Sequence, residues 1–115
     1  MITVSTITPV YAGEAFLEDL IEEIAEVRGR WVERSAPMQL AEAIFVNDSS
    51  RDDSMAVLLE MEERYPWVRV VQLSRNFGQH RATVAGILHS SGDWVVTLDE
   101  DLQHRPYDIE RMLCV

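Results

Sequence analysis

The chain has 115 residues, 47% hydrophobic and 26% charged, which is typical of one globular domain and excludes a disordered or fibrous protein. Twenty acidic residues against ten basic ones give a formal net charge of −10, so we expect no nucleic-acid partner, because such a partner needs clustered positive charge. The single cysteine excludes an internal disulfide and fits a reducing compartment. No apolar run reaches the ~18 residues of a membrane span, and the N-terminus lacks a basic signal region. We therefore expect a cytoplasmic protein.

The first third of the chain predicts a strand, a helix and a loop. Residues 2–7 alternate in the manner of a strand, which is expected to stop before Pro9 because proline cannot donate to a ladder. Apolar residues then recur with a helical period over 13–27, opposite a row of acidic residues that is expected to be a solvated face. Residues 29–39 are interpreted as a loop, with room for one helical turn around Trp31.

The middle of the chain repeats this alternation. Residues 43–46 predict a short buried strand, and the turn-forming and capping residues 47–50 end it. A helix is expected from Asp52, because apolar residues follow at helical spacing, and Pro66 closes it. Residues 68–73 predict a third strand.

The last third completes an alternating order of strands and helices. A helix is expected over 79–89, ended by a Ser-Ser-Gly stop signal, and a fourth strand over 93–98. Pro106 suits the first turn of a further helix. Alternation of this kind predicts an α/β fold, with a parallel sheet, helices on both faces and right-handed crossovers.

Polar clusters follow each of the four predicted strands, at 9–14, 47–50, 74–78 and 99–103. The carboxyl ends of parallel strands meet at one edge of the sheet, and ligands bind in the crevice outside that edge. Four separate loops therefore direct polar groups to the same place. This coincidence predicts a ligand site there.

Asp99, Asp101 and Gln103 are candidate metal ligands. They follow an apolar strand, and residues i, i+2 and i+4 share one face if the extended geometry continues. Their oxygen atoms are the ligands that Mg²⁺ and Mn²⁺ prefer, and such an ion commonly shares its shell with substrate phosphates. The alternative is that one Asp caps a turn and Gln103 is solvated, since an Asp-x-Asp pair also arises by chance.

Three further polar residues in these loops have two interpretations each. Asp48 suits hydrogen bonds from a ligand, and equally an Asx-turn or a helix cap. Arg75 suits pairing with phosphate or stacking on a base, or a surface ion pair. Glu14 suits a ribose hydroxyl, or stabilisation of a helix N-terminus.

Taken together, these segments resemble family 2 glycosyltransferases of the glycosyltransferase-A fold. The resemblance covers nearly the whole chain and rests on Thr8–Tyr11, Phe45–Ser50, Leu73–His80, Ser91–Asp93 and Leu98–Gln103. The Ser-Arg-Asn-Phe-Gly stretch joined to Asp-x-Asp-Leu-Gln is most similar to the branch that glycosylates polyprenyl phosphates such as dolichol and undecaprenyl phosphate. The resemblance implies a Rossmann-like parallel sheet with the strand order 3-2-1-4.

The resemblance also implies roles for the candidate residues. The donor would be a UDP- or GDP-linked sugar, and the acceptor of the full-length enzyme a lipid phosphate or a glycan. Mg²⁺ or Mn²⁺ would lie against the donor diphosphate, held by Asp99, Asp101 and Gln103. The nucleotide would contact Pro9, Val10, Tyr11, Glu14, Asp48, Arg75 and Asp99. The chain departs from the family at Asn47, where a second Asp is usual, and at Ala12-Gly13-Glu14, where an Asn-Glu pair is usual.

The family continues beyond these motifs with an acceptor pocket and a catalytic Asp base, and in this branch often with membrane helices. We therefore expect residues 1–115 to be the donor-binding subdomain, with no catalytic residue of its own and the catalytic base beyond Val115. The full-length enzyme is expected to act at the cytoplasmic face of a membrane. A sheet without its later strands exposes an edge and apolar surface, which favours self-association.

Two other classes of protein were weighed against this interpretation. The first alternative is a non-catalytic nucleotide-binding or assembly module. The second, a phosphotransfer domain, is disfavoured, because such domains pair their Asp with a Lys and this chain has none.

Overall fold

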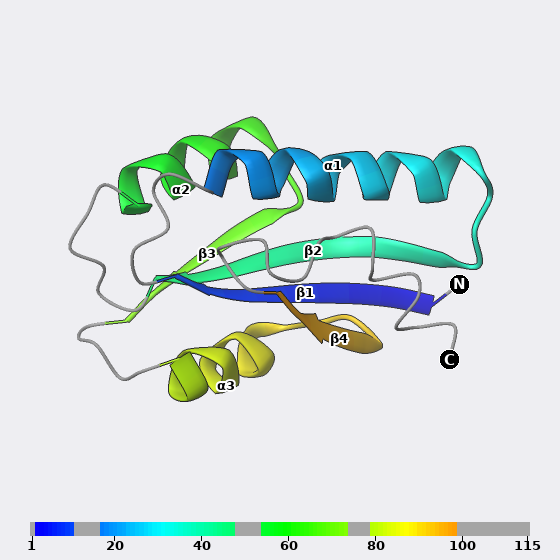
Figure 1. Cartoon of the computed structure of the whole chain (residues 1–115). Coiled ribbons are helices and arrows are strands. Elements are labelled where there is room, and N and C mark those ends of the chain that lie inside the picture. Colours follow the sequence, from blue (N-terminus) through cyan, green and yellow to red (C-terminus); the bar gives the residue numbers. More distant parts are fainter. Residues whose placement is uncertain (1, 11–16, 48–53, 74–78, 99–115) are drawn as a thin grey trace.

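The computed structural model describes residues 2–10, 17–47, 54–73 and 79–98. Strands and helices alternate along them, as the sequence predicts (Figure 1). The elements are β1 (Ile2–Val10), α1 (Leu17–Glu33), β2 (Met38–Asn47), α2 (Ser54–Arg64), β3 (Val68–Gln72), α3 (Gln79–His89) and β4 (Trp94–Thr97). The predicted helix from Pro106 and the predicted helix starts at Gly13 and Asp52 lie outside the described residues.

The four strands form one parallel sheet in the order β3-β2-β1-β4, which confirms the predicted order. In Figure 1, α1 and α2 lie on one face of the sheet and α3 on the other. Successive side chains of a strand point to opposite faces, so Val4 and Val10 of β1 pack in the cluster that holds the apolar faces of α1 and α2. Ile7 packs on the other face, against Ala82 of α3.

Strand β1 continues through Pro9 to Val10, so the prediction that it stops before the proline is wrong. Amide groups of a strand alternate between its two neighbours, and the carbonyl of Ile7 accepts a hydrogen bond from the amide of Leu98 beyond β4. Pro9, two residues further on, therefore has its missing N–H on the β4 side. The described pairing of β1 with β4 ends at Ile7, so the proline removes no bond of that ladder, and it still pairs with Val46 of β2.

Helix α1 is longer than predicted, because residues 29–33 belong to the helix and not to a loop. Trp31 extends the apolar face four residues beyond Val27 and is 2% exposed. Gly29 lies on the exposed side, where an added Cβ would meet no atom within 4 Å. A glycine inside a helix lowers stability by about 1 kcal/mol relative to alanine. The burial of a large aromatic side chain such as Trp31 contributes more than this, so the helix continues through Gly29.

The end of α1 has the hydrogen bonds of a Schellman motif. The amide of Ala36 donates to the carbonyl of Trp31 at 2.9 Å, and the amide of Ser35 donates to the carbonyl of Val32 at 3.2 Å. Ser35 has a φ of 52°, the left-handed conformation in which this motif usually places glycine. A serine therefore occupies a position that favours a residue without Cβ.

Strand β2 begins at Met38, five residues before the predicted strand over 43–46. Met38 lies opposite Ile2, and a bulge between Val4 and Ser5 inserts one extra residue of β2, so that Ser5 faces Glu42. The sequence pattern showed only the apolar half of this strand. Glu42 interrupts the apolar residues of its first half, because that side chain belongs to the hydrogen-bonded cluster described below.

The remaining elements agree with the predictions. Helix α3 has the predicted bounds, α2 ends two residues before Pro66, and β3 and β4 lie within the predicted ranges. Gly86 allows α3 to pack closely on the sheet, since an added Cβ would collide with the Cγ2 atom of Ile7 and lie 3.1 Å from that of Val46. The fold thus places three strands side by side, with the short β4 next to β1.

Candidate functional site

The carboxyl ends of β1, β2 and β3 meet at one edge of the sheet (Figure 1). Val10 pairs with Asn47, and Asn47 pairs with Gln72. The amide of Leu73 also donates to the carbonyl of Asn47 at 3.0 Å, so β3 stays joined to β2 to its end. The described residues that precede positions 11, 48 and 74 in the chain therefore lie at adjacent points.

Strand β4 points to the same edge of the sheet as the other three strands but ends before it reaches that edge. The amide of Leu98 donates to the carbonyl of Ile7 at 2.9 Å, three residues before the end of β1 at Val10. Leu98 is 1% exposed, so the residue that precedes Asp99 is fixed in the core. At about 3.3 Å per residue, this exit lies roughly 10 Å below the end of β1. Three of the four strands therefore end side by side and the fourth ends before that edge, while most residues of the polar clusters predicted to follow them lie outside the described residues.

Two of the predicted nucleotide contacts lie within the described residues. Val10 is fully buried in the core against α1, and Pro9 is buried on the opposite face of the sheet. Asn47, where the resemblance leads us to expect an acidic residue, is 2% exposed. A neutral amide at so buried a position avoids the desolvation of a carboxylate.

The other candidate residues lie outside the described residues, so their roles stay predictions. They are Tyr11, Glu14, Asp48, Arg75, Asp99, Asp101 and Gln103. Val115, beyond which the catalytic base is expected, also lies outside the described residues, and that expectation stays a prediction as well.

Two searches of the described residues gave no further candidate. Within the part of the chain that the structure describes, no group of three or more His, Cys, Asp or Glu residues is placed to hold a metal ion. No described helix is long and apolar enough to cross a membrane.

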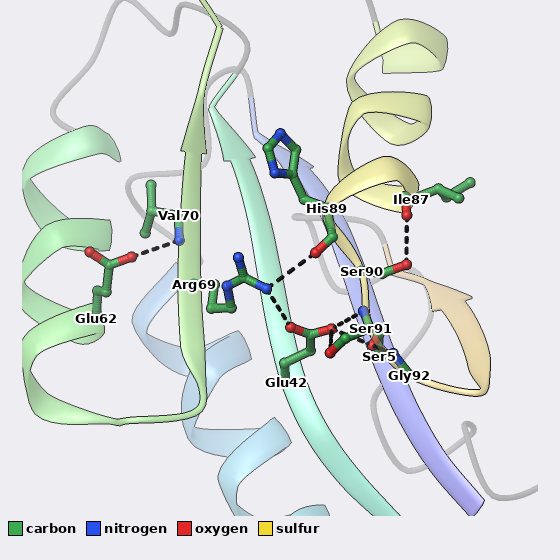
Figure 2. A network of polar contacts seen from close by, with 10 residues as sticks. All are labelled: Ser5, Glu42, Glu62, Arg69, Val70, Ile87, His89, Ser90, Ser91 and Gly92. Atoms are coloured by element: carbon green, nitrogen blue, oxygen red, sulfur yellow. Dashed lines mark hydrogen bonds and ion pairs between the residues drawn. The ribbon is translucent and has the colours of Figure 1, made fainter.

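A polar cluster that the sequence analysis missed lies at the other end of β4 (Figure 2). Glu42 of β2 is 5% exposed. Its Oε2 atom accepts hydrogen bonds from the Ser5 hydroxyl at 2.7 Å, the Ser91 amide at 2.6 Å and the Ser91 hydroxyl at 2.9 Å. Its Oε1 atom accepts one from Nη1 of Arg69 at 2.8 Å. The same Nη1 donates to the carbonyl of His89 at 3.1 Å, so the cluster joins three strands to the end of α3.

Burial by itself raises the pKa of the Glu42 carboxyl, because desolvation disfavours the charged form. The hydrogen bonds from Ser5, from the amide and hydroxyl of Ser91 and from Arg69 favour that form and outweigh burial. They lower the pKa of Glu42 from its ordinary value of 4.5 to about 2. Glu42 is therefore ionised in the folded chain at neutral pH, and the buried charge is fully hydrogen-bonded.

A second, exposed pair holds the start of β4. The carboxylate of Asp93 accepts hydrogen bonds from the amide and the hydroxyl of Thr3, both at 3.0 Å, and the Thr3 hydroxyl accepts one from the Asp93 amide at 3.0 Å. These bonds, led by the one from the Thr3 amide, lower the pKa of Asp93. The Gly92 amide, one residue earlier, donates to the Ser5 hydroxyl at 2.9 Å.

A sequence signal for this cluster exists. Glu42 interrupts an otherwise apolar stretch over 40–46, and Arg69 interrupts the apolar strand over 68–71. A charged residue in each of two neighbouring strands of a buried parallel sheet predicts an ion pair between them. The serine partners give no local signal, because they are far from Glu42 in the chain.

A family model, Glycosyl transferase family 2, matches residues 5–114. The chain belongs to glycosyl transferase family 2. Among curated proteins, this family 2 chain is 41% identical over 113 residues to the undecaprenyl-phosphate 4-deoxy-4-formamido-L-arabinose transferase of Sodalis glossinidius, covering 96% of this chain and 32% of the relative. It is 38% identical over 114 residues to the protein of that name from Pseudomonas savastanoi, covering 97% and 32%. The family 2 chain thus spans about a third of the length of these curated relatives.

Solved structures show the same fold. TarS 1–349 of S. aureus, in a crystal structure with UDP-GlcNAc, superposes with a TM-score of 0.75 at 19% identity, covering 97% of this family 2 chain and 30% of TarS. The mannosyltransferase PcManGT of Pyrobaculum calidifontis, in complex with GDP-Man and Mn²⁺, superposes with a TM-score of 0.70 at 22% identity, covering 85% and 27%. These matches confirm the predicted glycosyltransferase-A fold.

Proposed function

We propose that the chain is the donor-binding part of a glycosyltransferase that takes a sugar from a nucleotide diphosphate. The main support is that the ends of β1, β2 and β3 meet in register and that β4 ends beside them. The sequence that follows each of these strands contains a residue of the predicted donor site. The solved neighbours named above are complexes with UDP-GlcNAc and with GDP-Man. Both a uracil and a guanine nucleotide are therefore candidate donors.

The proposed cofactor is Mg²⁺ or Mn²⁺. The donor set fits either ion, because Asp99, Asp101 and Gln103 offer oxygen atoms alone. They follow Leu98, which the structure anchors in the core by its bond to Ile7. A divalent ion bound there would neutralise charge on the leaving diphosphate.

The proposed roles of this chain's other residues are binding and orientation. Pro9, Val10, Tyr11 and Glu14 would border the nucleoside, with Asp48 accepting hydrogen bonds from the base and Arg75 nearby. Ionised carboxylates accept such bonds strongly where water is excluded. The base that activates the acceptor is proposed to belong to a part of the enzyme beyond Val115.

The proposed acceptor is a polyprenyl phosphate, and the proposed location is the cytoplasmic face of a membrane. The supporting observation is that the relatives at 41% and 38% identity are both named for undecaprenyl phosphate, a lipid phosphate. The alignments with these relatives cover 96% or more of this chain.

A second candidate function is an assembly module that binds nucleotide without turning it over. Large apolar side chains are exposed on two neighbouring elements: Leu88 of α3 is 80% exposed, Trp94 of β4 is 44% exposed and Val95 is 38% exposed. β4 is also the last strand of the described sheet on its side. Such a surface favours self-association. Sugar transfer by the isolated chain would exclude the non-catalytic alternative.

The proposed metal site is tested with a matched pair of substitutions. Asp101→Ala should abolish any dependence of nucleotide binding on Mn²⁺. Asp19→Ala, which removes an exposed carboxylate from α1, should leave it unchanged. Calorimetric titration of UDP and of GDP into each variant, with Mn²⁺ and with EDTA, measures the effect. Equal dependence on Mn²⁺ in both variants would exclude Asp101 as a ligand.

A further inference from the structure

Three successive residues between α3 and β4 are each bound to β1 or β2 through a side chain, and Figure 2 shows the first two of them, Ser91 and Gly92. Ser91 donates its amide and its hydroxyl to Glu42 of β2. Gly92 donates its amide to the hydroxyl of Ser5 in β1. Asp93 exchanges hydrogen bonds with Thr3 at the start of β1. We call residues 91–93, with these bonds, the β4 anchor.

Apart from these bonds, the register of β4 is defined by its pairing with β1 and by two buried side chains, Val96 and Leu98. Strand β4 pairs only with β1, over Val4 to Ile7, and within the described sheet it has no strand on its other side. A slip of one residue turns every side chain of a strand to the opposite face. Such a slip would move Val96, which is 8% exposed in the core, out of its place, and would displace every residue that follows it.

Glu42 is the central acceptor of the β4 anchor and is itself held on two sides. The bulge in β2 sets it opposite Ser5, whose hydroxyl donates to it, and Arg69 of β3 donates from the other side. Gly92 lies so close to Ser5 that an added Cβ would be 2.5 Å from the Oγ atom of Ser5 and 2.7 Å from its backbone nitrogen. Position 92 therefore requires a residue without a side chain. The β4 anchor is thus attached directly to β1 and β2, and through Glu42 to Arg69 of β3.

We propose that Glu42 is a positioning residue for the metal-binding segment: by holding Ser91 it sets the register of β4, and so the position of Leu98, the residue that directly precedes Asp99 in the chain. This inference rests on the proposed function of residues 99–103. Chain connectivity supplies the link, because Asp99 follows Leu98 and the Leu98 amide bonds to Ile7 only in the observed register.

Amide hydrogen exchange tests the register without any ligand. Leu98 and Leu73 are the residues directly beyond β4 and β3, and each amide donates to the neighbouring strand, to Ile7 at 2.9 Å and to Asn47 at 3.0 Å. Glu42→Gln keeps the size of the side chain but removes its charge, so the bonds from Ser5 and Ser91 become weaker neutral ones and Arg69 loses its ion-pair partner. We expect exchange at Leu98 to accelerate about tenfold more than at Leu73.

The same variant is then titrated with Mn²⁺ in the presence of nucleotide. We expect the Mn²⁺ concentration for half-maximal binding to rise about tenfold, while metal-free nucleotide affinity stays within about twofold. Thr3→Val, a substitution at the partly exposed end of the anchor, provides a second variant that should fold and should show smaller changes of the same kind.

Glu62→Gln is the matched control. Glu62 of α2 accepts the amide of Val70 in β3 at 2.8 Å, so the same substitution weakens the same kind of bond on a strand that does not contact β4. It should leave exchange at Leu98 and the Mn²⁺ requirement unchanged.

Equal acceleration at Leu98 and Leu73 in Glu42→Gln would overturn the proposal, because Glu42 would then hold β3 through Arg69 as firmly as it holds β4 and would have no selective effect on β4. A selective change at Leu98 without a change in Mn²⁺ requirement would overturn it as well. If the proposed function itself fails, the unmodified chain will show no Mn²⁺-dependent nucleotide binding. That outcome differs from failure of the positioning role, in which the unmodified chain binds nucleotide and only the effect of Glu42→Gln is absent.

Discussion

The substitution Glu42→Gln should destabilise the chain at neutral pH and much less in acid. Glu42 is 5% exposed and ionised, and its hydrogen bonds from Ser5, Ser91 and Arg69 favour the charged form. Glutamine has nearly the same shape but no charge, so it resembles the protonated glutamic acid. The difference between the two chains therefore isolates the contribution of the charge.

The magnitude follows from the pKa of Glu42, which the fold lowers from 4.5 to about 2. That difference corresponds to about 3 kcal/mol of stability at pH 7. Solvent screens part of it, because the Arg69 side chain is 49% exposed. We therefore expect Glu42→Gln to reduce the free energy of unfolding by about 2 kcal/mol at neutral pH.

The sign of the pH dependence is fixed by the direction of the shift. A carboxyl whose pKa is lowered on folding stabilises the fold above its unfolded pKa, and this contribution is lost as pH falls through its folded pKa. For Glu42 the loss spans the interval from about 4.5 down to about 2. The difference between the chains should therefore shrink to about 1 kcal/mol at pH 3.5.

Urea unfolding of both chains at pH 7 and pH 3.5, followed by circular dichroism, measures this difference. The other acidic groups titrate in both chains, so their effects cancel in the comparison. A difference that stays constant between the two pH values would refute the reasoning, because the charge of Glu42 would then contribute nothing to stability. A variant more stable than the unmodified chain at pH 7 would refute it too.

Three further predictions concern backbone positions, and urea unfolding measures each. Ser35→Gly should stabilise the chain by about 0.5–1 kcal/mol, since Ser35 has a φ of 52° at the end of α1; a loss of stability would contradict the assigned Schellman motif. Gly29→Ala should stabilise it by about 1 kcal/mol, because the site is helical and nothing lies within 4 Å of the added Cβ. Gly86→Ala should destabilise it by about 1–3 kcal/mol, because the added Cβ would collide with Ile7. The changes in the free energy of unfolding of the two glycine variants should therefore have opposite signs.

The order of elements could be predicted from the sequence because local patterns encode it. Periodicity identifies α1 and α2, a stop signal ends α3, alternation identifies β1, and turn residues separate the elements. The boundaries were less predictable. Gly29 suggested the end of a helix, but the buried Trp31, four residues beyond Val27, prolonged it. Packing against the sheet decides where such a helix ends, and the local sequence pattern does not show that packing.

The β4 anchor could not be predicted for a related reason. Glu42 is 37 residues from Ser5 and 49 from Ser91 in the chain, and its charge is stabilised only when folding joins them. In the sequence alone, Glu42 interrupts the apolar residues over 40–46, and the predicted strand begins directly after it at residue 43. The convergence of strand ends was predictable, because topology alone places the carboxyl ends of parallel strands at one edge.

The central claim is that this family 2 chain binds a nucleotide diphosphate through a divalent cation. The most direct test is calorimetric titration of the unmodified 115-residue chain with UDP and with GDP, each in Mn²⁺ and in EDTA. The account predicts that at least one of the two nucleotides binds in Mn²⁺ and that its affinity falls by at least about tenfold in EDTA. No binding of either nucleotide, or equal binding with and without the metal, would contradict it.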